Sequence, residues 1–305
     1  MAYWRGNVVV LLLVVVCLLW ATGCATNKVS SGTVAPPTLH NCIVYTQAGD
    51  SDLMLDIAVP SEGGGPFPAI VFFCSNGWGY YSYGDRRQFS YPLEKCAQRG
   101  YVAVTADVRS TKFTQAGKPL CRFPDHVFDA KCVIRWLRAN ADKYRIDPDR
   151  VGTIGWGFGG YLSLMLGLTD PSDGLEGDCG DRGISSRVQA VVSFAGITEL
   201  SSQFREARNP VWTSDFMGGT PEDMPEQYAK ASPLTYVSKD DPPVLTLHGS
   251  EDVYIPANQA TLLDARMREV GASHTLVIKD GFDHFNFYNE PIVWEFMDRY
   301  LKNSM

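Results

Sequence analysis

A glycine stands at the position where this sequence otherwise predicts a chemically active side chain. The run Gly155-Trp-Gly157-Phe-Gly159 follows an apolar, strand-like stretch and precedes an apolar, helix-like one. This layout is typical of the nucleophile elbow, G-x-S-x-G, a sharp strand-to-helix turn that presents a serine for attack on an acyl carbonyl. The flanking glycines are present, but Gly157 has no atom that can attack a carbonyl. The identity of this residue therefore decides whether the chain can form an acyl-enzyme.

The same segment also spells G-x-G-x-x-G across Gly155, Gly157 and Gly160, which is the fingerprint of dinucleotide-binding turns. That fold requires an acidic residue at the end of the next strand, about 20 residues further on. The chain instead continues from Asp170 into a polar loop. We therefore favour the elbow interpretation and expect no cofactor and no metal.

Two later residues have the types and the chain order of an acid–base pair. Proteins with this elbow place the nucleophile first, then the acid, then the histidine. Asp252 follows one apolar run, and His284 lies in a polar loop after the next one. Asp252 would hold the tautomer of His284 and stabilise its imidazolium. The alternatives are a solvated loop aspartate and a surface histidine, and the neighbouring Glu251 and Asp283 fit the expected positions less well.

Alternating apolar segments must position these residues. An opening hairpin is predicted within residues 43–59. Continuous apolar runs, as buried parallel strands require, follow at 69–73, 102–106, 151–154, 190–194, 244–248 and 275–278. Helical spacing or context predicts helices at 124–140, 158–168, 257–270 and 287–302. This alternation predicts an α/β protein with a mostly parallel sheet covered by helices on both faces.

A series of short motifs occurs in order along the chain. They are 53–60, 123–124, 134–140, 146–150, the elbow, 185–190, 231–237, 240–243 and 248–252. Through these motifs the chain resembles the α/β-hydrolases of the esterase/lipase class, in particular the carbohydrate-esterase branch with its feruloyl and acetylxylan esterase-like proteins. The resemblance implies an α/β-hydrolase fold with a sheet of the eight-stranded type. It implies carboxylic ester hydrolysis or, on the same fold, arylformamidase-like hydrolysis.

The resemblance also implies an oxyanion hole, and here the sequence departs from the family a second time. The family carries His-Gly-Gly-Gly-Trp after its third strand, whereas residues 74–78 read Cys-Ser-Asn-Gly-Trp. The backbone N–H groups of Asn76, Gly77 and Phe158 are the expected donors. Trp78 is the expected pocket residue.

Residues 203–241 interrupt the alternation before the seventh core strand. Aromatic and methionine side chains stand there among proline and glycine. Such an insertion is typical of a small lid or pocket wall, and plain packing explains it equally well.

The first 24 residues predict export. Arg5 precedes an apolar run that is short for a bilayer span, and Ala-Thr-Gly-Cys24 follows. This segment resembles the lipobox of bacterial lipoproteins, which implies that Cys24 is lipidated and becomes the first mature residue. Ala25 then favours the outer membrane of the cell envelope. An ordinary cleaved signal peptide is the alternative.

Composition restricts the partners of the mature chain. Residues 25–40, rich in Ser, Thr and Pro, predict a flexible tether, and 41–305 predict one α/β-hydrolase domain. The net charge of −7 and the lack of basic runs argue against nucleic acid. We expect a small-molecule or carbohydrate ester as ligand and contact with the membrane through the lipid anchor.

Export also makes disulfides possible. The sequence cannot choose among the pairings of the cysteines beyond Cys24. Cys74, Cys96 and Cys132 fall in apolar patterns, and we expect them to be buried free thiols.

The missing serine leaves three accounts open. The protein is a pseudo-hydrolase that binds esters, or an esterase whose serine was removed by design or lost through a sequence error, or a slow hydrolase in which His284 activates water directly. A displaced nucleophile at Cys74 or Ser75 is a further alternative. The sequence predicts an esterase-family envelope lipoprotein with weak or absent hydrolysis. A non-catalytic ligand-binding or scaffold protein is the alternative from another class.

Overall fold

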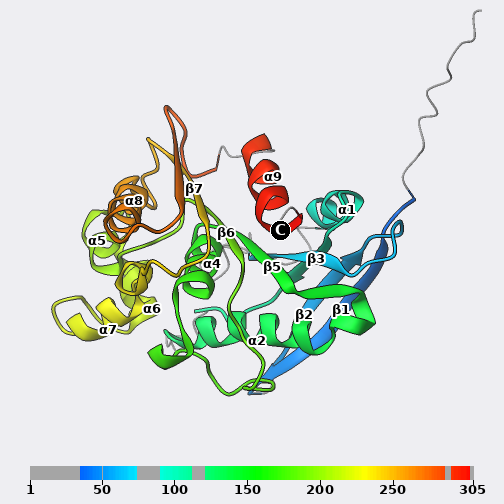
Figure 1. Ribbon diagram of the computed structural model, residues 1–305. Helices are drawn as coiled ribbons and strands as arrows, with labels where there is room; N and C mark the ends of the chain where they lie inside the picture. Colours follow the sequence, from blue (N-terminus) through cyan, green and yellow to red (C-terminus); the bar gives the residue numbers. More distant parts are fainter. Residues whose placement is uncertain (1–34, 50, 74–89, 112–120, 286–289, 303–305) are drawn as a thin grey trace, which may run out of the picture. The chain divides into compact units, whose positions relative to one another are not determined.

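The computed structural model describes residues 35–49, 51–73, 90–111, 121–285 and 290–302. The predictions for Cys24 and for residues 74–78 lie outside these ranges. The strands form one eight-stranded sheet in the order β1-β2-β4-β3-β5-β6-β7-β8 (Figure 1). Their bounds are β1 Thr38–Ala48, β2 Ser51–Val59, β3 Phe67–Phe73, β4 Val102–Ala106, β5 Ile146–Trp156, β6 Ala190–Phe194, β7 Val244–Gly249 and β8 His274–Lys279. β1 begins inside the segment predicted as a tether.

The sheet is mostly parallel. β1 and β2 pair antiparallel, as do β2 and β4, whereas every other pair in the sheet is parallel. β4 and β7 are buried along their whole length, as strands covered on both faces must be. The prediction of a mostly parallel sheet is therefore confirmed. The carboxyl ends of β5, β7 and β8, which precede the predicted site residues, lie at the same edge of the sheet.

Helices cover both faces of this sheet, as predicted. On one face α1 and α9 pack against the strands, and on the other α2, α4 and α8 do so (Figure 1). None of the helices in the described part of the chain is long and apolar enough to cross a bilayer. The helix bounds are α1 Ser90–Gln98, α2 Asp125–Ala139, α3 Ala141–Tyr144, α4 Phe158–Leu168, η3 Pro171–Asp173, α5 Leu200–Glu206, α6 Pro210–Met217, α7 Pro225–Ala231, η4 Pro233–Tyr236, α8 Asn258–Val270, α9 Pro291–Met297 and the π-helix η5 Asp298–Lys302.

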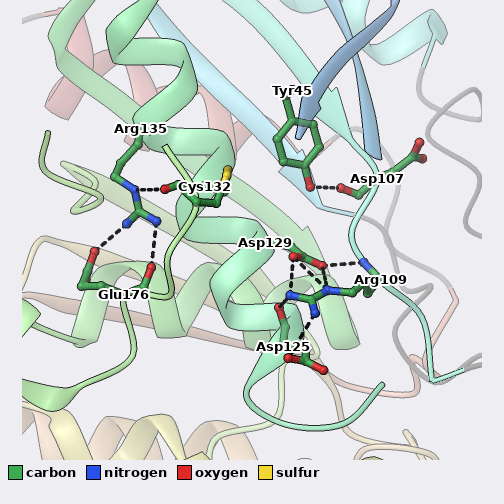
Figure 2. The surroundings of a disulfide bond; sticks show 9 residues. Tyr45, Asp107, Arg109, Asp125, Asp129, Cys132, Arg135 and Glu176 are labelled. Atoms are coloured by element: carbon green, nitrogen blue, oxygen red, sulfur yellow. Dashed lines mark hydrogen bonds and ion pairs between the residues drawn. A yellow bond between two sulfur atoms is a disulfide. The ribbon is translucent and has the colours of Figure 1, made fainter. Parts of the chain in front are cut away.

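A disulfide joins Cys132 of α2 to Cys179 in the loop that follows η3. The prediction of a free thiol at Cys132 is therefore wrong, whereas Cys96 is buried and free as predicted. The reason is tertiary: the loop folds back over α2 and brings the two Cα atoms to 5.4 Å. An ion pair between Arg135 and Glu176 lies beside the disulfide (Figure 2).

The single carboxylate of Glu176 pairs with two cations that α2 buries. Lys131 Nζ and Arg135 Nη1 each lie 2.7 Å from a carboxylate oxygen of Glu176. Burial opposes ionisation of Glu176, but the hydrogen bond and charge of Lys131 outweigh it and lower its pKa. Removing one member of such a group would leave a desolvated charge behind. The disulfide and the ion pairs therefore fix the same loop onto the same helix.

A buried histidine lies beneath the elbow. His126 of α2 packs edge-on against Phe158 and Phe216, with ring centroids 5.2 Å away in each case. Its Nε2 lies 3.1 Å from Thr111 Oγ1 and 3.3 Å from Cys121 Sγ. Burial, reinforced by the charge of Arg109, lowers the pKa of His126 to about 3. The imidazole is therefore neutral in the folded protein.

Loss of the disulfide should destabilise the fold. The bridge closes a sequence separation of 47 residues. The double change Cys132→Ser with Cys179→Ser should lower the free energy of unfolding by roughly 2–4 kcal/mol, measured by chemical denaturation. Cys42→Ser, at an exposed cysteine outside the bridge, is the control. Equal stability of the oxidised and reduced protein would contradict a structural role for the bridge.

Acid should destabilise the fold through His126. Its folded pKa of about 3 lies below the ordinary value of 6.5, so below about pH 6.5 the unfolded chain binds more protons. Stability should fall by about 2 kcal/mol between pH 7 and 5 from this residue alone. His126→Gln should flatten the pH dependence by that amount, whatever its effect on stability at pH 7. An NMR titration that finds His126 charged at pH 5 would refute this.

Candidate active site

The turn after β5 has the geometry that the elbow motif predicts. Gly157 joins β5 directly to α4, with φ 55° and ψ −114°, a conformation that side chains adopt only under strain. Its N–H donates to the Phe194 carbonyl at 2.8 Å, and its own carbonyl accepts from Tyr161 N at 3.0 Å. The turn is therefore held from both sides, and the residue at its apex is the glycine.

Close backbone contact explains the glycine before the turn. A Cβ atom built on Gly155 would overlap the carbonyl group of Gly159. The strand and the helix thus approach each other too closely for any other residue at position 155. β6, the next strand along the chain, ends at Phe194 and continues with Ala195 and Gly196, so no carboxylate stands where a dinucleotide-binding fold would place one. The glycines belong to the elbow.

The loop after β7 presents Asp252. One carboxylate oxygen, Oδ1, accepts the N–H groups of Tyr254 and Ile255, both at 2.9 Å. The other, Oδ2, lies 2.6 Å from Nδ1 of His284. Asp252 is 5% exposed, so these three donors replace the water that it loses on folding. The carboxylate organises its own loop and holds the histidine at the same time.

The loop after β8 presents His284, which is 7% exposed. Its backbone carbonyl accepts a hydrogen bond of 2.9 Å from the indole Nε1 of Trp156, the residue just before Gly157. The bond to Asp252 fixes the tautomer that carries its proton on Nδ1, which leaves Nε2 for proton transfer. Asp252 and His284 thus come together as predicted, and Trp156 ties their pair to the elbow.

Direct contacts between the acid loop and the histidine loop explain this convergence. A Cβ atom on Gly249 would overlap the carbonyl of Phe282, so the two loops touch through their backbones. Glu251 N donates to the same carbonyl at 2.9 Å, and Gly281 N donates to Ser250 Oγ at 2.9 Å. These contacts between the two loops therefore hold both side chains in one place.

A second buried histidine stands behind the acid, and the sequence reasoning did not single it out. His248 Nε2 donates to the Ile255 carbonyl at 2.7 Å and lies 3.7 Å from Asp252 Oδ2. Burial lowers the pKa of His248, although the Ile255 bond and the charge of Asp252 oppose this. It braces the acid loop as a positioning residue. The sequence feature that could have identified His248 is its place in the 248–252 motif.

The neighbouring carboxylates take no part in the pair. Asp283 is exposed and accepts the N–H of Phe285 at 2.8 Å, and Glu251 is exposed as well. Within the described ranges, no hydroxyl or thiol is hydrogen-bonded to the ring of His284. In the same ranges, no group of three or more His, Cys, Asp or Glu side chains could hold a metal ion.

Of the three expected oxyanion donors, only Phe158 lies within the described residues. Phe158 is the first residue of α4, at the end of the helix where backbone N–H groups and the helix dipole favour negative charge. Asn76, Gly77 and Trp78 fall outside the described residues, as do Cys74 and Ser75. The described half of the site is therefore a helix N-terminus beside an acid–base pair.

The insertion before β7 contacts both halves of this arrangement. Trp212 and Phe216 lie four residues apart on α6 and so share one side of the helix. Phe216 packs edge-on against Phe158 at 5.3 Å, and Trp212 stacks on Tyr254 at 5.9 Å and 7°. The insertion is packed into the core at Phe216 and borders the acid loop at Trp212.

The described part of this arrangement can accept and return a proton at Nε2 of His284. Elbow, acid and histidine occupy the relative chain positions of a hydrolytic triad. The oxygen that would attack is the part that Gly157 lacks. The geometry therefore supports general acid–base chemistry without a nucleophilic side chain at the elbow.

Comparison with known proteins agrees with this geometry. The BD-FAE family model matches residues 55–267. The esterase LipC of Mycobacterium tuberculosis is 31% identical over 214 residues, which are 68% of this chain and 50% of that protein. The chain spans about half the length of the curated relatives that it matches first.

Two solved structures share the fold. A truncated form of a carbohydrate esterase from gut microbiota superposes with a TM-score of 0.73 at 24% identity, covering 89% of this chain and 98% of that one. Esterase 2 of Thermogutta terrifontis superposes with a TM-score of 0.67 at 26% identity, covering 89% and 91%. The chain therefore belongs to the BD-FAE family, and its fold is that of the α/β-hydrolase esterases.

Proposed function

We propose that this protein binds carboxylic esters at the elbow and hydrolyses them only slowly, with water as the attacking group. One observation carries the proposal: the Asp252–His284 hydrogen bond of 2.6 Å stands beside an elbow whose central residue is Gly157. An intact base without a side-chain nucleophile can act only on a hydroxyl that comes from solvent or from the ligand.

In the proposed reaction the ester carbonyl lies near the N-terminus of α4. Nε2 of His284 takes a proton from a water molecule, whose oxygen attacks the carbonyl carbon. The imidazolium, stabilised by Asp252, then returns the proton to the leaving alkoxide as the ester C–O bond breaks. Ester and water become carboxylic acid and alcohol, and no covalent intermediate forms on the protein.

The expected rate is low. Removing the serine of a hydrolytic triad lowers kcat by about 2 × 10⁶, as in the subtilisin case. Roughly 10³–10⁴-fold acceleration over water survives in such variants through binding and the oxyanion hole. A single-step reaction with water also lacks the proximity of a bound nucleophile. Weak turnover with intact ligand binding is therefore the proposed behaviour.

The ligand class follows from the family resemblance and stays part of the proposal. Acyl esters of carbohydrates, including acetyl and feruloyl esters, are the first choice. Small esters or arylformamidase-like substrates are the same-fold alternative. A purely ligand-binding role is the limiting case in which the water reaction is too slow to matter.

We also propose that the protein is anchored to a membrane. Residues 1–24 carry the features of a lipoprotein signal, with Cys24 as the acylated residue. Two or more acyl chains hold a protein on a bilayer stably, whereas a single chain binds marginally. We place the domain on the cell envelope, at the outer membrane, as a lipid-anchored protein.

Restoring the nucleophile should restore hydrolysis. Gly157→Ser should raise kcat/KM for p-nitrophenyl acetate by about a thousandfold or more, because the triad is then complete. The restored serine should also take up one phosphoryl group from paraoxon, seen by mass spectrometry, since Thermogutta terrifontis esterase 2 has been solved phosphorylated by that compound. Gly157→Ala, which adds the Cβ atom without the oxygen, is the matched control.

The residual rate tests the water mechanism by itself. In the chain as it stands, His284→Ala should abolish the slow hydrolysis, whereas Asp283→Asn should leave it unchanged. An unchanged rate in His284→Ala would rule out water activation by this residue. Ordinary esterase rates in the chain as it stands, lost in His284→Ala, would instead show that another nucleophile is at work.

Lipidation should depend on one side chain. Cys24→Ala should move the protein from the membrane fraction to the soluble fraction of the producing bacterium, because the acyl chains then have no attachment point. Cys17→Ala, inside the apolar run, is the control. Retention of Cys24→Ala in the membrane would contradict the anchor.

A further inference from the structure

A series of aromatic rings begins at His284 and continues over the acid loop. Phe285 and Tyr254 both meet the imidazole edge-on, with ring centroids at 5.1 and 5.9 Å. Tyr254 in turn meets Phe285 at 5.8 Å and stacks on Trp212 at 5.9 Å. Trp212, Tyr254 and Phe285 come from three separate segments. We call them the aromatic wall.

The aromatic wall coincides with exposed apolar surface. Phe285 is 57% exposed, although an aromatic side chain of this size is ordinarily covered. Trp212 and Tyr254 are half-buried. Exposed aromatic surface beside an acid–base pair is typical of a ligand-binding surface.

The wall is also held rigidly. Tyr254 N donates to Asp252 Oδ1 at 2.9 Å, and its carbonyl accepts from Gln203 Nε2 at 2.8 Å. The carbonyl of Val253 accepts from Arg208 N at 2.9 Å. The backbone under the wall is therefore fixed before any ligand arrives, which reduces the entropy lost on binding.

The position of the wall indicates which half of an ester it would meet. In ester hydrolysis the histidine returns its proton to the leaving oxygen, so that oxygen must come within hydrogen-bond distance of Nε2. The group attached to the leaving oxygen then lies next to His284. Phe285 and Tyr254 are the rings in contact with that imidazole. The alcohol half of the ester, rather than the acyl half, lies at the wall.

We propose that the aromatic wall is the subsite for the alcohol half of the ester and selects alcohols that carry a flat-faced ring. This inference rests on the proposed function, because it takes His284 as the proton donor to the leaving oxygen. Aryl rings and the C–H faces of pyranoses share the required chemistry, since both present a flat apolar surface to an aromatic ring. Tyr254 and Phe285 are the specificity-determining residues.

Slow turnover allows binding of intact esters to be measured directly. The probes are benzyl acetate, methyl 6-O-acetyl-glucopyranoside and the acyclic hexyl acetate, titrated into the protein by NMR. We expect the ring esters to bind about fivefold to tenfold more tightly than hexyl acetate. Tyr254→Leu and Phe285→Leu should each remove this preference. Tyr254→Phe, which keeps the ring, should retain it, so a loss through misfolding is distinguishable from a loss of the ring.

Leu262→Ala, which trims another exposed hydrophobic side chain on α8, is the matched control and should leave all three affinities unchanged. A preference for both ring esters, or for one of them, supports the subsite, and the preferred one identifies the alcohol as aryl or carbohydrate. Binding of hexyl acetate as tight as that of the ring esters would overturn the proposed subsite. A ring preference that survives both leucine variants would overturn it as well.

Failure of the subsite can be told apart from failure of the proposed function. Gly157→Ser assayed with ethyl acetate, which has no ring, reports on hydrolysis at the elbow without a contribution from the aromatic wall. Hydrolysis of ethyl acetate without any ring preference in binding removes the subsite and keeps the function. Absence of both binding and hydrolysis removes the two together.

Discussion

The hydrogen bond between Asp252 and His284 is the interaction on which the site depends. Both side chains are nearly excluded from water, and within the described residues the carboxylate accepts hydrogen bonds from the imidazole and from two backbone N–H groups of its own loop. Loss of the imidazole would leave a desolvated charge short of one donor, at a cost of about 1.5–3 kcal/mol. The contacts between the loops after β7 and β8 keep the imidazole against the carboxylate and so avoid this cost.

The elbow keeps its shape for reasons that do not involve a nucleophile. The strand and helix on either side of Gly157 pack backbone against backbone at Gly155, and Trp156 donates to the histidine loop. Asp252 likewise has a structural role, because its carboxylate accepts hydrogen bonds from Tyr254 N and Ile255 N. A chain without the serine can therefore retain the acid and the base through folding constraints alone. Their presence therefore does not by itself require full catalysis.

The surroundings of the site are stabilised from two directions. Below the elbow, neutral His126 and Phe216 fill the space against Phe158, which links α2 and the insertion to the turn. Further away, the Cys132–Cys179 disulfide and the ion pairs of Glu176 fix the loop that follows α4. Helix α6 connects the space below the elbow with the acid loop, since Phe216 is buried against Phe158 and Trp212 stacks on Tyr254. One insertion thus packs into the core and borders the acid loop.

The sequence by itself determined the fold class, the elbow and the chain order of Asp252 and His284. Buried parallel strands must be continuous apolar runs, and a sharp turn with close backbones must contain glycine, so both features are local and readable. Only the tertiary structure decided the Cys132–Cys179 pairing, the burial of His126 and His248, and the aromatic wall. These depend on which distant segments meet, as when Trp212 reaches Tyr254 through a helix packed on the elbow. Local residue patterns carry no information about such contacts, because the packing of the whole chain sets them.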